Sequence, residues 1–138
     1  MTETGRLTGS CLCGALRYEA HTAPLYMGYC CCGDCRKASG SGFVGFLGFA
    51  PGAVKVTGEA VGHFLPHEDG RTAQRYRCAS CGGLVLGGEP NGATGNNVYA
   101  GSLDDPAMFK PTMAIFVREK PDWVILPEGL TLFEEMPK

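Results

Sequence analysis

The sequence lacks the excess of basic residues that marks many nucleic-acid-binding proteins. It also lacks the long apolar segment that marks membrane-spanning proteins. Its 12 Lys and Arg stand against 14 Asp and Glu, a net charge of −2, which predicts no basic surface for nucleic acid. No apolar run approaches the roughly 20 residues of a membrane-spanning helix. The first ten residues are polar and give no sign of a secretory signal. We therefore expect a cytoplasmic protein that binds neither nucleic acid nor a membrane.

The sequence also lacks an internal repeat and a linker long enough to divide it, which predicts a single domain over residues 1–138. Glycine is abundant, with 21 among 138 residues, about twice its usual share of ~7%. Short apolar segments between Gly and Pro predict a mainly β protein with little helix. Strands are expected at residues 15–19, 25–29, 43–49, 54–57, 62–65, 73–77, 84–86, 98–101 and 112–117. Helical turns are expected at 36–39 and at 104–106, where an aspartate caps and a proline opens the turn.

Eight cysteines are present in three groups, and seven of them, all but Cys31, have the spacing of metal ligands. The groups are C-L-C at residues 11–13, C-C-C-G-D-C at residues 30–35 and C-A-S-C at residues 78–81. In a reducing compartment such clustering favours metal over disulfide bonds. A disulfide framework is the alternative, and the missing export signal argues against it.

The C-x-x-C pair of Cys78 and Cys81 is the strongest local signal. Gly82 follows directly and permits the positive φ that a tight turn around a metal needs. A closed structural zinc site takes four ligands, and Cys11 with Cys13 supplies the other two. An iron–sulfur cluster or a redox-active pair is a weaker interpretation, and spacing alone does not prove which pair joins which.

The middle group predicts a different kind of site. In an extended segment Cys30 and Cys32 share a face and Cys31 points away, so we expect Cys31 to be buried. Cys35 completes a set of three, and three protein ligands with one vacant position are typical of catalytic zinc. A closed site is the alternative, with a fourth ligand from Cys31, His21, His63, His67 or a carboxylate.

Taken together, these motifs resemble the family of glutathione-dependent formaldehyde-activating enzymes. The resemblance rests on residues 9–18, 30–40, 76–82, 101–106, 115–117 and 120–123. It implies a β-tent fold of small antiparallel sheets organised around a structural zinc. It implies two zinc ions per chain, a structural one on Cys11, Cys13, Cys78 and Cys81 and a catalytic one on Cys30, Cys32 and Cys35. The implied activity is that of a carbon–sulfur lyase that condenses glutathione with formaldehyde to S-hydroxymethylglutathione.

The two carboxylates of glutathione call for cations in the pocket. Arg36 and Lys37 follow Cys35 directly and are the expected substrate-binding residues. Arg71, Arg75 and Arg77 are weaker candidates, because alternate strand positions more often form a solvated face. No proton donor is evident, and water is sufficient for that role.

Two positions depart from the family pattern. Cys31 stands where a histidine is usual, and Ala114 stands where a histidine often precedes the Ile-Phe-Val stretch, so we expect an altered substrate pocket. The same scaffold could act on another thiol adduct or small carbonyl compound, and a non-catalytic zinc-binding interaction module is a further alternative. Trp123 and the apolar residues after it are expected in the core.

Overall fold

The structure is a computed structural model that describes residues 6–67, 70, 72–88, 92 and 94–137. The described residues form eleven strands, one α-helix and three short 3-10 helices. The strands are β1 (Leu7–Ser10), β2 (Arg17–Ala20), β3 (Tyr26–Cys30), β4 (Val44–Phe49), β5 (Val54–Thr57), β6 (Ala60–Pro66), β7 (Thr72–Cys78), β8 (Leu84–Gly87), β9 (Asn96–Tyr99), β10 (Met113–Ile115) and β11 (Thr131–Leu132). The helices are α1 (Gly33–Ser39), η1 (Ala100–Ser102), η2 (Pro106–Met108) and η3 (Val117–Glu119). The prediction of a mainly β protein with little helix is confirmed. No helix in the described part of the chain is long and apolar enough to cross a membrane.

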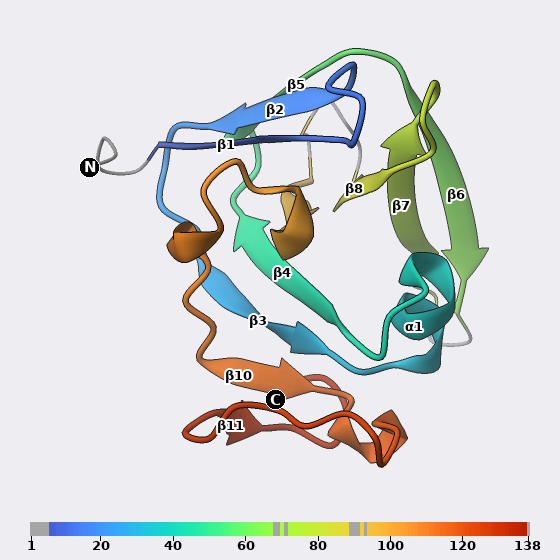
Figure 1. Cartoon of the computed structure of the whole chain (residues 1–138), viewed down its shortest axis with the longest axis vertical. Helices are drawn as coiled ribbons and strands as arrows, with labels where there is room; N and C mark the ends of the chain where they lie inside the picture. The colour runs from blue at the N-terminus through green and yellow to red at the C-terminus, as the bar shows by residue number, and fades with distance from the viewer. Residues whose placement is uncertain (1–5, 68–69, 71, 89–91, 93, 138) are drawn as a thin grey trace.

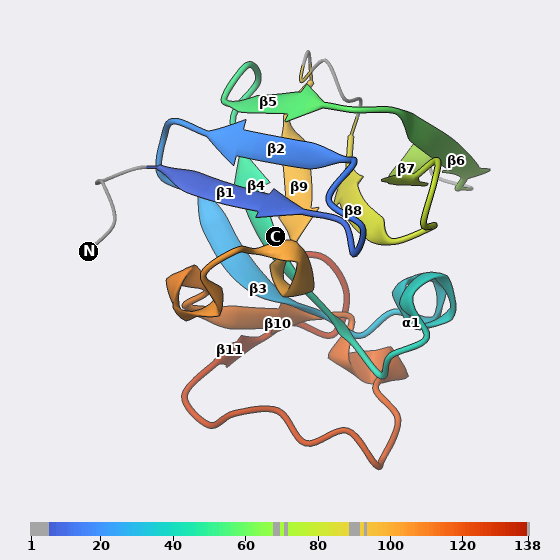
Figure 2. The same ribbon diagram turned by 45° about the horizontal axis from the view of Figure 1, so that its top comes forward.

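The strands form two sheets, which Figures 1 and 2 show from two directions. A three-stranded antiparallel sheet has the order β1-β2-β5. An eight-stranded sheet has the order β11-β10-β3-β4-β9-β8-β7-β6. Its strands pair antiparallel except where β10 runs parallel to β3 and to β11. In Figure 2 the small sheet lies across β4, β9 and β8.

The main core lies between these two sheets. Leu16, Tyr18 and Val54 come from the small sheet and its turns, and they pack in one cluster with Leu47 and Val98 of the larger sheet. Leu16, Leu47 and Val98 are fully buried. Burial of these side chains stabilises the fold, at about 1.5–3 kcal/mol for each large aliphatic residue. This cluster therefore joins the two sheets, and a second, smaller buried cluster contains Cys30, Phe46 and Ile115.

Several strand boundaries differ from the predictions for local reasons. The expected strand at 98–101 lies earlier, in β9, because Ala100 begins the 3-10 helix η1. The strand expected at 112–117 stops at Ile115, because Phe116 adopts a left-handed conformation (φ 55°, ψ 37°) and η3 follows. Strands β1 and β11 were not predicted; each carries few apolar residues and depends on its partner strand.

The helix α1 starts earlier than the expected turn at 36–39. Its N-cap is Cys32, whose sulfur accepts a hydrogen bond from the backbone N–H of Cys35. The 3-10 helix η2 begins as predicted, with Asp105 capping it and Pro106 opening it. The core prediction for the segment after Pro121 is wrong in part: Trp123 is 72% exposed, and only the next residue, Val124, is buried.

Candidate metal centres and pocket

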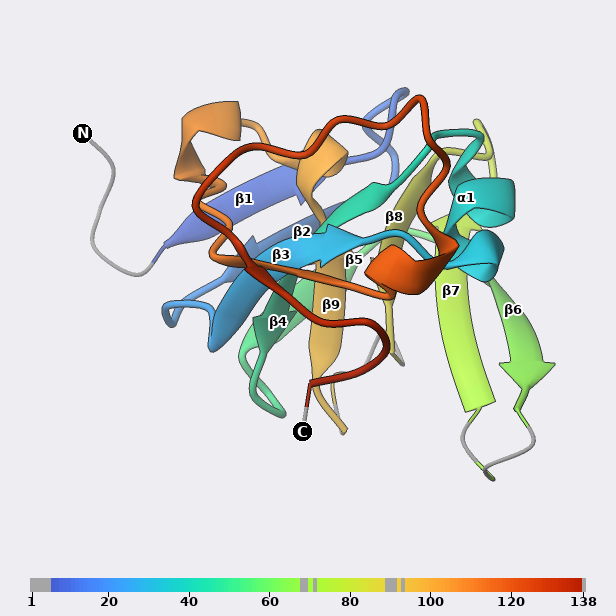
Figure 3. The same ribbon diagram turned by 90° about the horizontal axis from the view of Figure 1, so that it is seen from below.

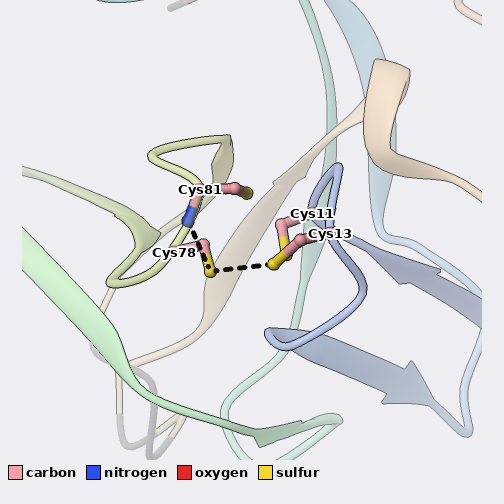
Figure 4. Close-up of side chains that lie close together, drawn as sticks. All are labelled: Cys11, Cys13, Cys78 and Cys81. Carbon is pink, nitrogen blue, oxygen red and sulfur yellow. Dashed lines mark hydrogen bonds between the residues drawn. The ribbon is translucent and has the colours of Figure 1, made fainter.

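Four cysteines from two distant turns meet at one end of the core. Cys11 and Cys13 lie in the turn between β1 and β2, while Cys78 ends β7 and Cys81 lies in the turn that follows. Their sulfurs lie within 4.8 Å of one another, and Figure 4 shows the two pairs facing each other. The structure thus brings the C-x-C pair to the C-x-x-C pair, which spacing alone could not prove.

The four-cysteine set has the dimensions of a closed metal site. The Sγ–Sγ distances from Cys13 to Cys11 and to Cys78 are both 3.7 Å. Four sulfurs around a tetrahedral zinc, each at about 2.3 Å, would be separated by about 3.8 Å. Gly14 and Gly82 close the two turns with φ of 84° and 78°, which glycine adopts at little cost. The residues present therefore fit a four-coordinate metal ion.

Backbone N–H groups point at these sulfurs. Leu16 donates to the Cys11 sulfur at 3.3 Å, Ser80 donates to the Cys78 sulfur at 3.3 Å, and Gly83 donates to the Cys81 sulfur at 3.4 Å. Hydrogen bonds to a charged sulfur stabilise the thiolate, the form that binds metal. The local fold of both turns is therefore suited to negatively charged ligands.

The second set lies where β3 passes into α1. Cys30 ends β3, Cys32 caps α1, and Cys35 lies in the first turn of that helix, with all three sulfurs within 4.8 Å of one another. Within the described residues, no fourth His, Cys, Asp or Glu joins this set. Of the other ligands considered, His63 accepts a hydrogen bond from Arg77 at 3.0 Å, and His21 lies 3.4 Å from Glu19. All eight cysteines lie in the described part of the chain, and all are free thiols.

Close sulfur–sulfur contact shapes the acidity of this three-cysteine set. Hydrogen bonds from Cys30 and then Cys35 lower the pKa of Cys32 to about 2. The same contacts, from Cys32 and then Cys35, raise the pKa of Cys30 far above its usual value. The first of the three adjacent thiols thus loses its proton readily. A second thiol resists deprotonation unless a cation lies among the sulfurs. A metal ion would be such a cation, so the donor chemistry fits one.

A pocket of about 790 Å³ adjoins the three-cysteine set. Cys30, Cys32 and Cys35 all line it, whereas none of the four-cysteine set does, although all four are described. This volume is within the usual range of small-molecule sites, about 300–1,000 Å³. The apolar part of the wall includes Val44, Phe46, Met113, Ile115 and Phe116. The polar part includes Thr72, Gln74, Arg75, Asn97 and Tyr99.

Among the described residues that line the pocket, Arg75 is the one arginine or lysine, and His67, a candidate fourth ligand, lies in the same wall. Arg71 lies outside the described residues. The Nη2 of Arg75 donates to the Sγ of Cys35 at 3.7 Å. Arg36 and Lys37, the expected substrate-binding residues, are not among the residues that line the pocket, and Lys37 is exposed. Strand alternation predicted that Arg75 lies on a solvated face. This prediction missed the contact with Cys35, because no sequence signal reveals that this part of β7 borders α1. The contact of Arg36 and Lys37 with substrate stays a prediction.

Both departures from the family pattern lie behind the pocket. Cys31 is 0% exposed, as predicted, and its backbone N–H donates to the carbonyl of Ile115 at 3.1 Å. Ala114 is also 0% exposed, and its neighbours across the sheet are Tyr29 and Leu132. Neither residue lines the pocket. The expectation of an altered substrate pocket stays a prediction.

Comparison with known proteins agrees with this arrangement. A family model described as "Glutathione-dependent formaldehyde-activating enzyme" matches residues 6–119, which include both cysteine sets and Arg75. A protein of Halomonas elongata named "Putative glutathione-dependent formaldehyde-activating enzyme" is 28% identical over 124 residues, which cover 86% of this chain and 79% of that protein. The chain therefore belongs to the family of glutathione-dependent formaldehyde-activating enzymes.

Proposed function

We propose that this chain is a zinc-dependent carbon–sulfur lyase that condenses glutathione with formaldehyde to S-hydroxymethylglutathione. The observation that carries the proposal is the contrast between the two cysteine sets. The three-cysteine set lines a pocket of small-molecule size, and the four-cysteine set does not. A ligand in the pocket can therefore reach an ion at one set only.

The residues divide between two zinc ions. Cys11, Cys13, Cys78 and Cys81 would hold a structural ion with all four positions filled by protein. Cys30, Cys32 and Cys35 would hold the second ion, which when bound supplies a Lewis acid that favours the thiolate form of an added thiol. The whole chain, residues 1–138, would act as one cytoplasmic domain around these two sites.

Arg75 favours an anionic thiol in the pocket, whose wall also carries the carboxyl groups of Asp34 and Glu119. Arg75 places a positive charge beside Cys35 and offsets the charge that three thiolates and a fourth sulfur bring together. Phe46, Ile115 and Phe116 form an apolar surface near the same sulfurs, which limits water and strengthens that attraction. Gln74 and Asn97 offer amide groups to the peptide bonds of glutathione.

The reaction forms one bond between the glutathione sulfur and the formaldehyde carbon. The carbonyl π-electron pair moves to the oxygen, which takes up a proton, while the thiol loses one, so the addition is balanced without an oxidant. Water is sufficient as the proton donor. The reverse reaction breaks the same carbon–sulfur bond, and the enzyme accelerates both directions equally.

Magnetisation-exchange NMR tests the proposal directly, because glutathione, formaldehyde and their adduct interconvert spontaneously. We expect micromolar zinc-loaded protein to raise the exchange rate above this background. The Cys35→Ser variant should lose the acceleration and retain its circular dichroism spectrum. Cys31→Ala removes a neighbouring thiol outside both sets and should remain active. An exchange rate equal to the protein-free value would overturn the assignment to glutathione and formaldehyde, and other thiols and aldehydes would then be assayed in the same way.

A further inference from the structure

The chain after β10 returns to lie along the three-cysteine region. Residues 131–137, here called the C-terminal strap, begin with β11, which pairs parallel to β10 at the end of the larger sheet. Figure 1 shows β11 beside β10, and Figure 3 shows the dark red chain continuing from there to the C-terminus. Five backbone hydrogen bonds join it to residues 112–118: Thr131 to Thr112 (3.0 Å), Phe133 to Ala114 (2.9 Å), Phe116 to Glu135 (3.1 Å), Val117 to Phe133 (3.1 Å) and Arg118 to Glu134 (3.4 Å). The strap is therefore held along its length.

Side chains add two further contacts. Arg118 and Glu135 form an ion pair of 2.6 Å. Phe133 packs against the buried cluster that contains Cys30, Phe46 and Ile115. The strap thus packs against the same buried cluster as Cys30, a member of the three-cysteine set.

The strap ends in the wall of the pocket. Met136 and Pro137 line the same cavity as the three cysteines, Arg75 and Asn97. Met136 remains 43% exposed, so part of its side chain is open to a ligand or solvent. Both side chains are apolar and lack a hydrogen-bonding group, which suits them to contact with the methylene groups of a bound molecule.

This part of the wall lies outside the family match. The match covers residues 6–119 and hence the cysteine sets, but not the strap. The three cysteines and most of the pocket wall thus belong to the matched part of the chain, whereas Met136 and Pro137 are the lining residues that the family model does not describe. Such a division is typical of enzymes whose reaction is shared and whose substrate selection differs.

We propose that Met136 and Pro137 are specificity-determining residues that contact the thiol substrate beyond its sulfur and favour glutathione over smaller thiols. This inference rests on the proposed function, because it requires a thiol in the pocket. A two-carbon thiol would be held by its sulfur alone. A tripeptide thiol also extends toward the outer wall, where the strap supplies apolar surface.

Isothermal titration calorimetry on the zinc-loaded protein tests this with two probes, glutathione and 2-mercaptoethanol. A variant ending at Glu135 removes Met136 and Pro137 together with Lys138, and keeps the five backbone hydrogen bonds and the Arg118–Glu135 ion pair. We expect its Kd for glutathione to rise about five- to tenfold, as removal of partly buried apolar side chains implies, and its Kd for 2-mercaptoethanol to change less than twofold. Met136→Ala should show the same selectivity with a smaller change. Ile125→Ala is the matched control, because Ile125 is 84% exposed and does not line the pocket.

The outcomes separate this inference from the proposed function. If neither thiol binds the wild-type protein, both are wrong. If both thiols bind and the shortened variant weakens them equally, or weakens neither, the specificity role of the strap is wrong and the proposed function stands. Metal content and circular dichroism, measured on every variant, reveal a loss of fold, and Met136→Ala then decides the matter.

Discussion

The side chain of Glu119 accepts a hydrogen bond of 2.8 Å from the backbone N–H of Gly33, the first residue of α1. The contact joins η3 to the point where β3 passes into α1, between Cys32 and Cys35. An acidic side chain at this position also interacts favourably with the positive N-terminal end of the helix dipole. Glu119 therefore helps to fix the backbone from which two of the three cysteines project.

Loss of the hydrogen bond between Glu119 and Gly33 should make the positions of Cys32 and Cys35 less fixed and so weaken metal binding at the three-cysteine set. We expect Glu119→Ala to weaken metal binding there about three- to tenfold, in line with a net hydrogen-bond contribution of about 0.5–1.5 kcal/mol. Glu119→Gln keeps an oxygen acceptor and should lie close to wild type. Competition with a chromophoric chelator measures the affinity of each site. Equal metal retention by the alanine and wild-type proteins would show that α1 keeps its position without Glu119.

Removal of one ligand from the four-cysteine set should affect the whole fold. This set joins the turn after β1 to the turn after β7, and hence the two sheets. For Cys81→Ser we expect metal content to fall by one ion per chain and the thermal midpoint to drop by at least about 10 °C, since structural zinc contributes many kcal/mol. Elemental analysis and calorimetry measure both.

Cys31→Ala is the matched control for Cys81→Ser. It removes a buried thiol that belongs to neither set, so metal content should be unchanged and the cost should be about 1 kcal/mol, as for a small cavity. If the thermal midpoint of Cys81→Ser equals that of the wild type, the four-cysteine set has no structural role.

The charge of the side chain at position 75 should affect the metal affinity of the three-cysteine set. Because Arg75 donates to the Cys35 sulfur, we expect Arg75→Gln to weaken metal binding there about tenfold, at the lower end of the effects seen for groups that hydrogen-bond a metal ligand. Arg75→Lys keeps the charge without the planar guanidinium and should be intermediate. Chelator competition with both variants is the measurement, and Arg77→Gln, outside the pocket, should resemble wild type. Identical affinities for the wild-type, lysine and glutamine proteins would remove Arg75 from the site.

Alkaline pH should destabilise the small sheet through Tyr18. Burial raises the pKa of Tyr18 to about 12, although its hydroxyl also forms a hydrogen bond of 2.8 Å with Ser102. In the unfolded chain the phenol ionises near its ordinary pKa of 10, so unfolding is favoured as pH rises from about 10 to 12. Between pH 9 and pH 11 the wild type should lose about 1 kcal/mol more stability than Tyr18→Phe does.

Urea unfolding at both pH values measures this difference. Tyr18→Phe starts from a lower stability at pH 9, because it loses the hydrogen bond to Ser102, but it lacks the phenol that titrates. Parallel pH profiles for the two proteins would mean that Tyr18 ionises in the folded state as easily as in the unfolded chain.

Local pattern and spacing predicted the features that depend on neighbouring residues. Alternation located nine of the strands approximately, and cysteine spacing indicated the members of both sets, although the pairing of the C-x-C with the C-x-x-C came from the structure. Alternation also placed Cys31 in the interior, because an extended segment directs successive side chains to opposite faces. These predictions succeeded because each relies on a few adjacent residues whose geometry the backbone restricts.

Features that depend on tertiary neighbours were missed. Alternation could not reveal that Arg75 borders α1, nor that Glu119 reaches Gly33 across 86 positions of sequence. β11 has two residues, and its parallel pairing with β10 has no sequence signature. Trp123 was placed in the core by residue type, yet it packs at the surface against Gly42. Each miss concerns a contact whose second partner lies far along the chain.

The long separation between the halves of the four-cysteine set has a consequence for biosynthesis. Cys13 and Cys78 are 65 positions apart. At a translation rate of about 5–20 residues per second, the first two thiols leave the ribosome about 3–13 seconds before their partners do. During that interval the nascent chain cannot assemble the site, and its N-terminal thiols are open to oxidants and to competing metals.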